Sequence, residues 1–346
     1  MGPGVQRAGP LLRLRPGAAP HPRPTRAWRA VVVLGALACA GARADENGAS
    51  VWLPGSFASL AAVPVEPGFY VLAMPYVYGG SHTGSKGLPR GGSVSAELDA
   101  QVAILATLVG YAPEARVLGG QLMAGLAFAG GFVSAQQRGA VPIGSTVAVR
   151  DVADSKTGGS DLYPIATLYW SDDVHNWMTY VLGDLPVGAY DPQRIANIGL
   201  GHFAVDVGGG YTYLNPRIGL QASAVVGFTF NFENTHTDYT NGIDSHLDWS
   251  VSQFLSEAFF VGPAGYVYWQ LTSDTYPTAG IAGAARSAIL GTFQSGVASL
   301  GGEVGAVVKF GGLQGLLSLR GYWEFWAQNR LQGYSIFAQL NVPIFR

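Results

Sequence analysis

Residues 218–233 alternate between two kinds of side chain along their whole length, IGLQASAVVGFTFNFE. Every second residue from Ile218 is apolar, and this set ends in Phe228, Phe230 and Phe232, whereas the residues between them are mostly polar or small. Because a β-strand presents successive side chains to opposite faces, the pattern predicts a strand with one apolar and one polar face. Soluble strands are typically about five or six residues long. The apolar face therefore needs an apolar environment that is unusually deep.

The same alternation recurs along most of the chain. Long polar breaks are expected over 136–160 and 274–302, whereas other breaks, such as that near Gly312, are short. Antiparallel strands joined alternately by short turns and long loops are typical of transmembrane β-barrels, which must close because an open edge would leave backbone groups unsatisfied in lipid. The pattern predicts twelve strands, near residues 69–79, 96–110, 116–133, 161–171, 175–186, 200–214, 217–233, 244–256, 258–273, 303–311, 313–327 and 333–345.

Composition supports this all-β, antiparallel transmembrane barrel of about 12 strands. Of the 346 residues, 48% are hydrophobic and 12% are charged, about half the charged fraction of a typical soluble domain. The sequence contains no apolar run of the roughly 18 residues that a membrane-spanning helix requires. A soluble β-sandwich is the alternative, since its strands also alternate, but it would have shorter strands and more charge outside.

The first 44 residues differ from the rest of the chain. They carry seven arginines and no acidic residue, then the apolar run AVVVLGALACA over 30–40, then Ala-Arg-Ala before Asp45. This order predicts a cleaved signal peptide over 1–44 and export of the chain, with an N-terminal anchor helix or a lipoprotein signal at Cys39 as alternatives. Cleavage would leave 13 basic and 22 acidic residues, a formal charge of −9. An acidic chain is a poor partner for nucleic acid, and none is expected.

Residues 45–67 are apolar, rich in Gly and Pro, and without strand alternation. They precede the barrel, which is expected to span 68–346. A lumen of about 12 strands is too wide to be filled by wall side chains alone, so we interpret 45–67 as a plug inside it. Trp52, Phe57 and Leu60 of this segment are then the candidate contacts for a hydrophobic solute.

The polar faces of the strands are expected to line the lumen. The histidines show no spacing typical of a metal site, and the sequence 244–246, Asp-Ser-His, places neighbours on opposite faces of a strand, where they cannot form a catalytic triad. We therefore expect no catalytic residue, no metal site and no cofactor. The candidate lumen-lining polar residues are Gln221, Ser223, Asn231, His202, Asp206, His246 and Asp248.

Two stretches resemble a known family. They are SHLDWSVSQFLSEAFFVGPAGYVYWQLTSD, residues 245–274, and PGSFASLAAVP, residues 54–64. Both are similar to the outer-membrane proteins named after meta-pathway phenol degradation, whose members are similar in outline to the fatty-acid and toluene channels of Gram-negative outer membranes. The resemblance implies uptake of hydrophobic, often aromatic, compounds.

Together these patterns predict a Gram-negative outer-membrane channel that passes small hydrophobic compounds by passive diffusion and is not an enzyme. Its expected partners are outer-membrane lipid, the hydrophobic solute and the barrel-assembly machinery. The alternative is an outer-membrane barrel with a sealed lumen, either a lipase-like enzyme or a structural protein.

Overall fold

The computed structural model describes residues 50–87, 93–143, 146–275, 294–310 and 313–345. The expected signal peptide, residues 1–44, lies outside these ranges. The strands are β1 (Gly68–Gly87), β2 (Ser93–Ala112), β3 (Arg116–Val117), β4 (Gly120–Ile143), β5 (Thr146–Asp172), β6 (His175–Asp184), β7 (Ala204–Asn215), β8 (Leu220–Asn231), β9 (Asp244–Phe254), β10 (Phe259–Gln270), β11 (Gly296–Phe310), β12 (Leu313–Gln328) and β13 (Gln332–Phe345).

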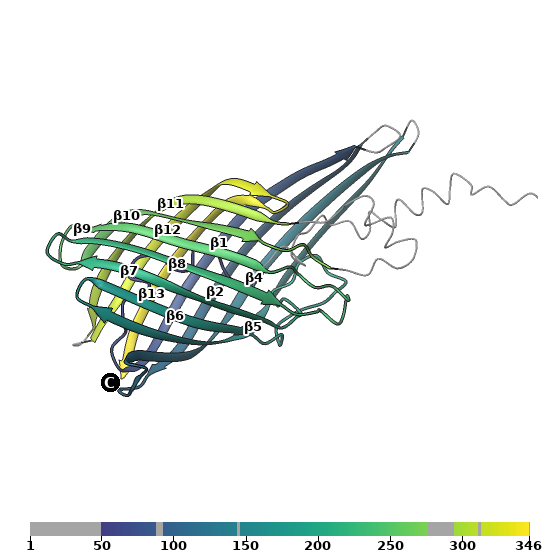
Figure 1. The fold of residues 1–346 in the computed structure, drawn as a ribbon. Helices are drawn as coiled ribbons and strands as arrows, with labels where there is room; N and C mark the ends of the chain where they lie inside the picture. The colour runs from purple at the N-terminus through teal and green to yellow at the C-terminus, as the bar shows by residue number, and fades with distance from the viewer. Residues whose placement is uncertain (1–49, 88–92, 144–145, 276–293, 311–312, 346) are drawn as a thin grey trace, which may run out of the picture.

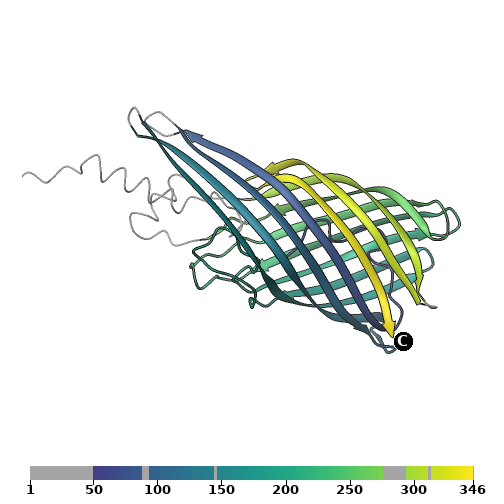
Figure 2. The same cartoon turned by 180° about the vertical axis from the view of Figure 1, so that it is seen from behind.

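The strands form one closed antiparallel barrel (Figures 1 and 2). Neighbours along the chain pair with each other, and β1 pairs with β13, for example at Tyr76 and Phe337. The two-residue β3 pairs only with the start of β4, and β2 pairs directly with β4, so twelve strands make the wall. The structure confirms the predicted all-β fold and strand number. In the described ranges, no helix has the length and apolar character needed to cross a membrane.

The alternation of β8 places its two sets of side chains on opposite sides of the wall. Val226 is 44% exposed and Phe228 41% exposed on the outside, whereas Val225 just before them and Thr229 just after them are buried inside the barrel. Exposed apolar residues recur on the outer face of the other strands, such as Leu105 and Ile336. Because closure satisfies the backbone groups of the wall, this apolar outer face can contact lipid.

The two ends of the barrel differ. At one end, which we call the turn end, the connections are short and include 173–174, 216–219 and 255–258. The other end, which we call the loop end, carries the longer connections 185–203, 232–243 and 271–295. β1 starts at the turn end and β13 finishes there (Figure 1).

Four strands extend further than the others at the loop end. β1, β2, β4 and β5 have 20, 20, 24 and 27 residues, whereas the remaining wall strands have 10 to 16. Their ends project beyond the rest of the wall (Figures 1 and 2). The polar stretch 136–160 that we expected to be a loop thus belongs largely to β4 and β5, which pair from Gln136 and Ala153 up to Ile143 and Thr146. A hairpin above the bilayer needs no apolar outer face, so its strands lack the lipid-facing pattern.

Candidate functional site

Residues 50–67, which we call the inner segment, lie inside the barrel against the inward faces of several strands. Gly55 N donates to Oδ1 of Asp248 at 2.9 Å, and Phe57 N donates to Oδ2 of the same carboxylate at 3.1 Å. Further along, Ser59 N donates to Oε2 of Glu303 at 3.0 Å and Ala62 N donates to Oγ1 of Thr212 at 3.0 Å. Strand side chains therefore satisfy backbone groups that the segment cannot satisfy itself.

The local sequence explains why the inner segment forms turns and not a strand. Ser56 N donates to Leu53 O and Val63 N donates to Leu60 O, so two tight turns follow each other. Gly55 has φ +85°, and a Cβ there would lie 2.9 Å from the rings of Tyr266 and Tyr322. This position therefore requires glycine on grounds of both conformation and space. Leu60 has φ +67°, a conformation that non-glycine residues adopt at a cost.

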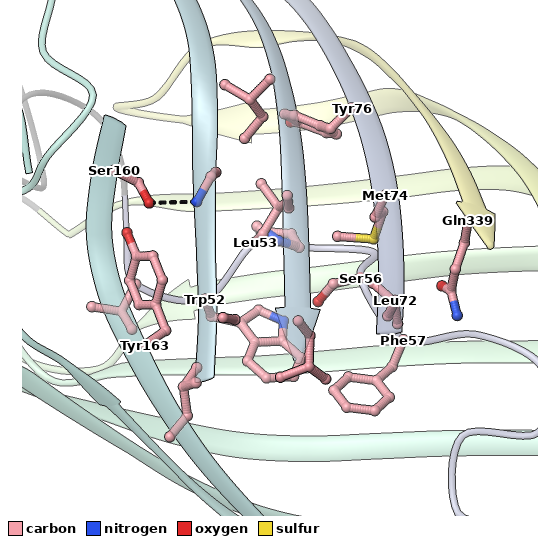
Figure 3. Close-up of a pocket in the computed structure, with 18 of the residues that line it drawn as sticks. Trp52, Leu53, Ser56, Phe57, Leu72, Met74, Tyr76, Ser160, Tyr163 and Gln339 are labelled. Atoms are coloured by element: carbon pink, nitrogen blue, oxygen red, sulfur yellow. Dashed lines mark hydrogen bonds between the residues drawn. The ribbon is translucent and has the colours of Figure 1, made fainter. Parts of the chain in front are cut away.

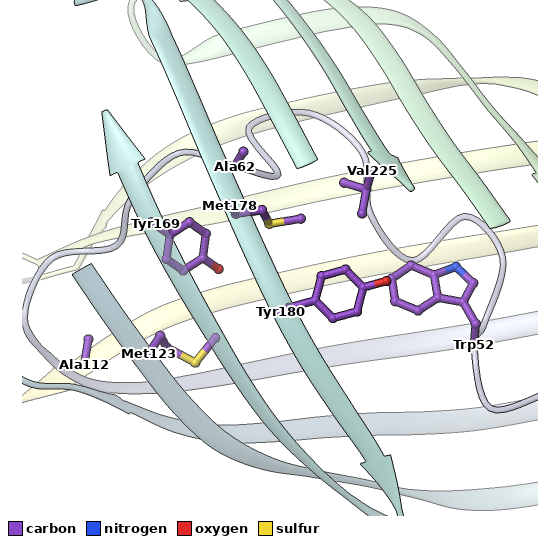
Figure 4. Packing of buried hydrophobic residues seen from close by; sticks show 8 residues of the cluster. All are labelled: Trp52, Ala62, Ala112, Met123, Tyr169, Met178, Tyr180 and Val225. Atoms are coloured by element: carbon purple, nitrogen blue, oxygen red, sulfur yellow. The ribbon is translucent and has the colours of Figure 1, made fainter. Parts of the chain in front are cut away.

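A buried cluster fixes the start of the inner segment. The Trp52 ring stacks on the His246 ring with centroids 3.7 Å apart. His246 Nε2 lies 3.3 Å from Oδ1 of Asp206, and Tyr180 donates its hydroxyl to the same oxygen at 2.7 Å. Figure 4 shows the Tyr180 side chain reaching toward Trp52 from the wall. The Asp206–His246 pair thus lies on the inward face of the wall, and the Trp52 ring covers it.

The second part of the segment is held by hydroxyl and amide groups of β7, β8 and β9. Gln221 Nε2 donates to Ser59 Oγ and to Ser250 Oγ, both at 3.0 Å, and Ser59 Oγ lies 2.7 Å from Ser252 Oγ. Ser223 Oγ in turn donates to Gln221 Oε1 at 2.7 Å. From β12, Arg320 Nη1 donates to Ser56 O at 3.0 Å. These contacts give the segment polar partners along one side.

The inward faces of β1, β2, β4 and β5 are different. They carry few charged groups where they face the inner segment, and their inward residues include Tyr70, Leu72, Met74, Tyr76, Val102, Ile104, Ala106, Leu108, Met123, Ala127, Tyr163 and Ile165. The lumen that we expected to be polar throughout is therefore polar on one half and apolar on the other. The outward face of β2 is also apolar, as Leu105 shows, so alternation alone does not reveal this half.

A cavity of about 490 Å³ lies between the inner segment and this apolar half. Figure 3 shows residues that line it, among them Trp52, Leu53 and Phe57 of the inner segment and Leu72, Met74 and Tyr76 of β1. Small-molecule sites are typically apolar pockets of roughly 300–1,000 Å³ with a few polar groups. The polar groups that line this cavity include Arg320, Glu324, Gln339 and Asn341. The cavity thus has the size and lining of a site for a small apolar molecule.

The structure places each residue that the sequence singled out. Trp52, Phe57 and Leu60 all line the cavity. Of the polar set, Gln221, Ser223, Asp206, His246 and Asp248 are buried on the inward face and belong to the contacts above. Asn231 lies near the loop end, where its Nδ2 donates to Oδ2 of Asp244 at 2.9 Å. His202 precedes β7 in the connection 185–203, and its Nε2 lies 3.3 Å from Asn241 Nδ2.

Sequence reasoning missed two charged residues that hold or flank the inner segment, Glu303 and Arg320. Both occupy inward positions of their strands and are nearly fully buried. A charge in the middle of an apolar strand, as in GGEVGAV or LSLRGYW, is the signal that marks such positions. Among the residues that the structure describes, no group of three or more His, Cys, Asp or Glu side chains is placed to hold a metal ion.

A family model described as the putative MetA-pathway of phenol degradation matches residues 82–340. The chain belongs to this family. The match includes every wall strand from β2 to β12 and the last part of β1. No curated protein matches the sequence.

Solved structures show the same fold in another protein of the outer membrane. The COG4313 outer membrane channel from Pseudomonas putida F1 aligns with a TM-score of 0.57 at 11% identity, covering 81% of this chain and 96% of that one. A FadL homologue from Pseudomonas aeruginosa aligns with a TM-score of 0.31 at 10% identity, covering 85% of this chain and 94% of that one.

Proposed function

We propose that this protein is an outer-membrane channel for the passive uptake of small hydrophobic compounds. The observation that carries the proposal is the cavity between the inner segment and the apolar half of the lumen. A solute that enters it exchanges water for apolar side chains such as Met74 and Ile104, which favours binding by about 25 cal/mol per Å² of apolar surface buried. The family's description, which names phenol degradation, supports an aromatic solute.

The location follows from the same structure. An apolar outer face around a closed barrel suits a lipid bilayer, and bacterial barrels of this kind are found in the outer membrane. Their short turns face the periplasm and their longer loops face outward. In this orientation the loop end is extracellular, and the barrel-assembly machinery would insert the chain after a signal peptide over 1–44 had directed its export.

The inner segment would act as a plug over 45–67. It fills the polar half and leaves the cavity as the remaining space beside it. Trp52, Phe57 and Leu60 would contact the solute, because they form the cavity wall on the segment's side. Since the segment is held by hydrogen bonds to single side chains, a modest rearrangement would change the width of the path.

Uptake by whole cells tests the proposal. Cells with an intact lipopolysaccharide layer are compared with and without this chain for the initial rate of uptake of radiolabelled naphthalene. We expect a faster rate with the chain at low solute concentration. Equal rates would contradict the channel function, and hydrolysis of phospholipid by the purified protein would favour the lipase-like alternative.

A further inference from the structure

At the loop end, β1, β2, β4 and β5 extend the barrel sheet beyond the neighbouring strands. We call this extension the projecting sheet and define it as residues 82–87 of β1, 93–100 of β2, 133–143 of β4 and 146–159 of β5. The pairing of β1 with β13 stops at Ser81, and that of β5 with β6 stops at Ile165, with one bridge at Leu162. Beyond these points no strand among the described residues pairs with either edge of the sheet.

The outer face of the projecting sheet is polar. Arg138 Nη2 lies 3.0 Å from Oδ2 of Asp151, and Arg138 Nη1 lies 3.9 Å from Oε2 of Glu97. All three side chains are exposed, as are Asp99 and Gln101 on β2. Lower on the same face, residues such as Leu105 are apolar. The outer surface therefore changes from lipid-facing to water-facing just above Ala103.

On β2 and β4, the inner face of the projecting sheet has the opposite character. Leu98 and Ala100 of β2 lie beside Val133 and Ala135 of β4, with Ala100 paired to Ala135 and Val102 to Val133. Leu98, Ala100, Val133 and Ala135 belong to the lining of the cavity inside the barrel. The apolar lining thus continues from the lumen onto a sheet whose outer side faces water.

The connection 185–203 faces this inner surface and is held in place. Arg194 Nε donates to Oδ2 of Asp154 at 3.1 Å, within an ion pair between these two side chains. Gly188 N and Leu200 N donate to the two carboxylate oxygens of Asp161, at 2.7 Å and 2.6 Å. Ile195 and Ile198 of this connection line the same cavity. The apolar surface is therefore bounded by a fixed loop opposite the sheet.

We infer that the apolar part of this inner face, formed by Leu98 and Ala100 of β2 and Val133 and Ala135 of β4, is together with Ile195 and Ile198 a capture site for a small, uncharged hydrophobic solute before it enters the lumen cavity. This inference rests on the proposed function. The occupant follows from continuity and charge: these six residues share one apolar lining with the cavity and none of them is charged, while the carboxylate of Asp154 beside them is paired with Arg194. Such a solute would lose contact with water at the loop end and reach the cavity without being exposed to water again.

Cysteine labelling on intact cells tests the site. The only cysteine, Cys39, lies in the expected signal peptide, so Ala100→Cys on the inner face and its neighbour Gln101→Cys on the outer face each give one reporter. A membrane-impermeant maleimide is applied with and without naphthalene. We expect naphthalene at about twice its dissociation constant to slow labelling of Ala100→Cys about threefold, since only the free site reacts, and to leave Gln101→Cys unchanged.

Each other outcome overturns the inference. Equal labelling rates with and without naphthalene at position 100 would exclude capture, as would equal slowing at both positions. Poor labelling of position 100 that recovers at low expression would assign the face to a second copy of the chain. Val133→Cys is the second inner reporter if Ala100→Cys does not reach the surface.

The uptake rate of the unmodified protein separates this inference from the proposed function. Uptake above the control without protection would leave the channel in place and remove the capture site. Protection without uptake would keep a binding site and remove the channel.

Discussion

The two halves of the lumen face different neighbours, and their side chains differ accordingly. The half formed by β7, β8, β9, β11 and β12 contacts the inner segment, and it supplies Asp248, Glu303 and Arg320 to backbone groups of that segment. The half formed by β1, β2, β4 and β5 faces the cavity and carries residues such as Met74 and Ile104. Both halves present the same apolar surface outward. The side chains of the outer face thus suit contact with lipid in both halves, whereas those of the inner face differ with what they contact inside the barrel.

This comparison explains why an irregular segment can sit in a membrane barrel. Buried backbone groups without hydrogen-bond partners are costly. The wall strands use their own backbone groups to pair with one another, so they offer none to the inner segment. The polar half satisfies them with side chains, so the inner segment needs no secondary structure of its own. The apolar half does not need to supply hydrogen-bond partners to the inner segment, so its side chains can instead line a space for a solute.

Loss of the Asp248 carboxylate should give the largest effect on the polar half. Asp248→Ala removes the acceptor of Gly55 N and Phe57 N, and each unsatisfied buried donor costs about 1 to 3 kcal/mol. We expect the inner segment to detach and the ion conductance in planar bilayers to rise. The matched control is Asp151→Ala on the exposed outer face of β5. A conductance for Asp248→Ala equal to that of the control would show that the segment is held by other contacts.

A charge on the outer face should separate the lipid-facing wall from the projecting sheet. Val226→Arg places a cation in the apolar band and should cost about 2 to 4 kcal/mol of folding stability in lipid vesicles. Gln101→Arg lies above that band and should cost at most about 1 kcal/mol. Urea-induced unfolding in vesicles measures both values. Similar losses at the two positions would contradict the membrane boundary that we place just above Ala103.

The smallest expected effect concerns backbone strain in the inner segment. Leu60 has φ +67°, which costs an L-amino acid about 1 to 2 kcal/mol. Both Leu60→Gly and Leu60→Ala remove the side chain, but only glycine also relieves the strain. Leu60→Gly should therefore be more stable than Leu60→Ala by about 1 kcal/mol in the same unfolding experiment. The reverse order would mean that the segment adopts another conformation there.

The barrel was predictable from the sequence because lipid demands apolar residues at every second position, as along 218–233. The division of the lumen into a polar half and an apolar half was not predictable from the sequence. The inward residues of β2, such as Ile104, alternate with equally apolar outward residues such as Leu105. The strand therefore shows no alternation of hydropathy that would distinguish its lumen face from its lipid face. The extension of β4 and β5 through 136–160 was missed for the opposite reason, since strands above the membrane carry no apolar outer row. The position of Trp52, Phe57 and Leu60 inside the barrel could be predicted because apolar residues outside any strand need a buried environment, whereas their contact with a solute stays a prediction.

The central claim is that hydrophobic solute passes through the apolar half of the lumen, and filling that half tests it most directly. Ala106 points into the cavity from β2, whereas Ala103 on the same strand is exposed on the outer face. Tryptophan at either position is compatible with its surroundings, but only Ala106→Trp occupies the cavity. The measurement is the initial rate of naphthalene uptake by cells that carry equal surface amounts of each variant. We predict that cells with Ala106→Trp take up naphthalene no faster than cells without the chain, and that cells with Ala103→Trp take it up at the rate of the unmodified protein. Equal uptake by both variants would contradict the account.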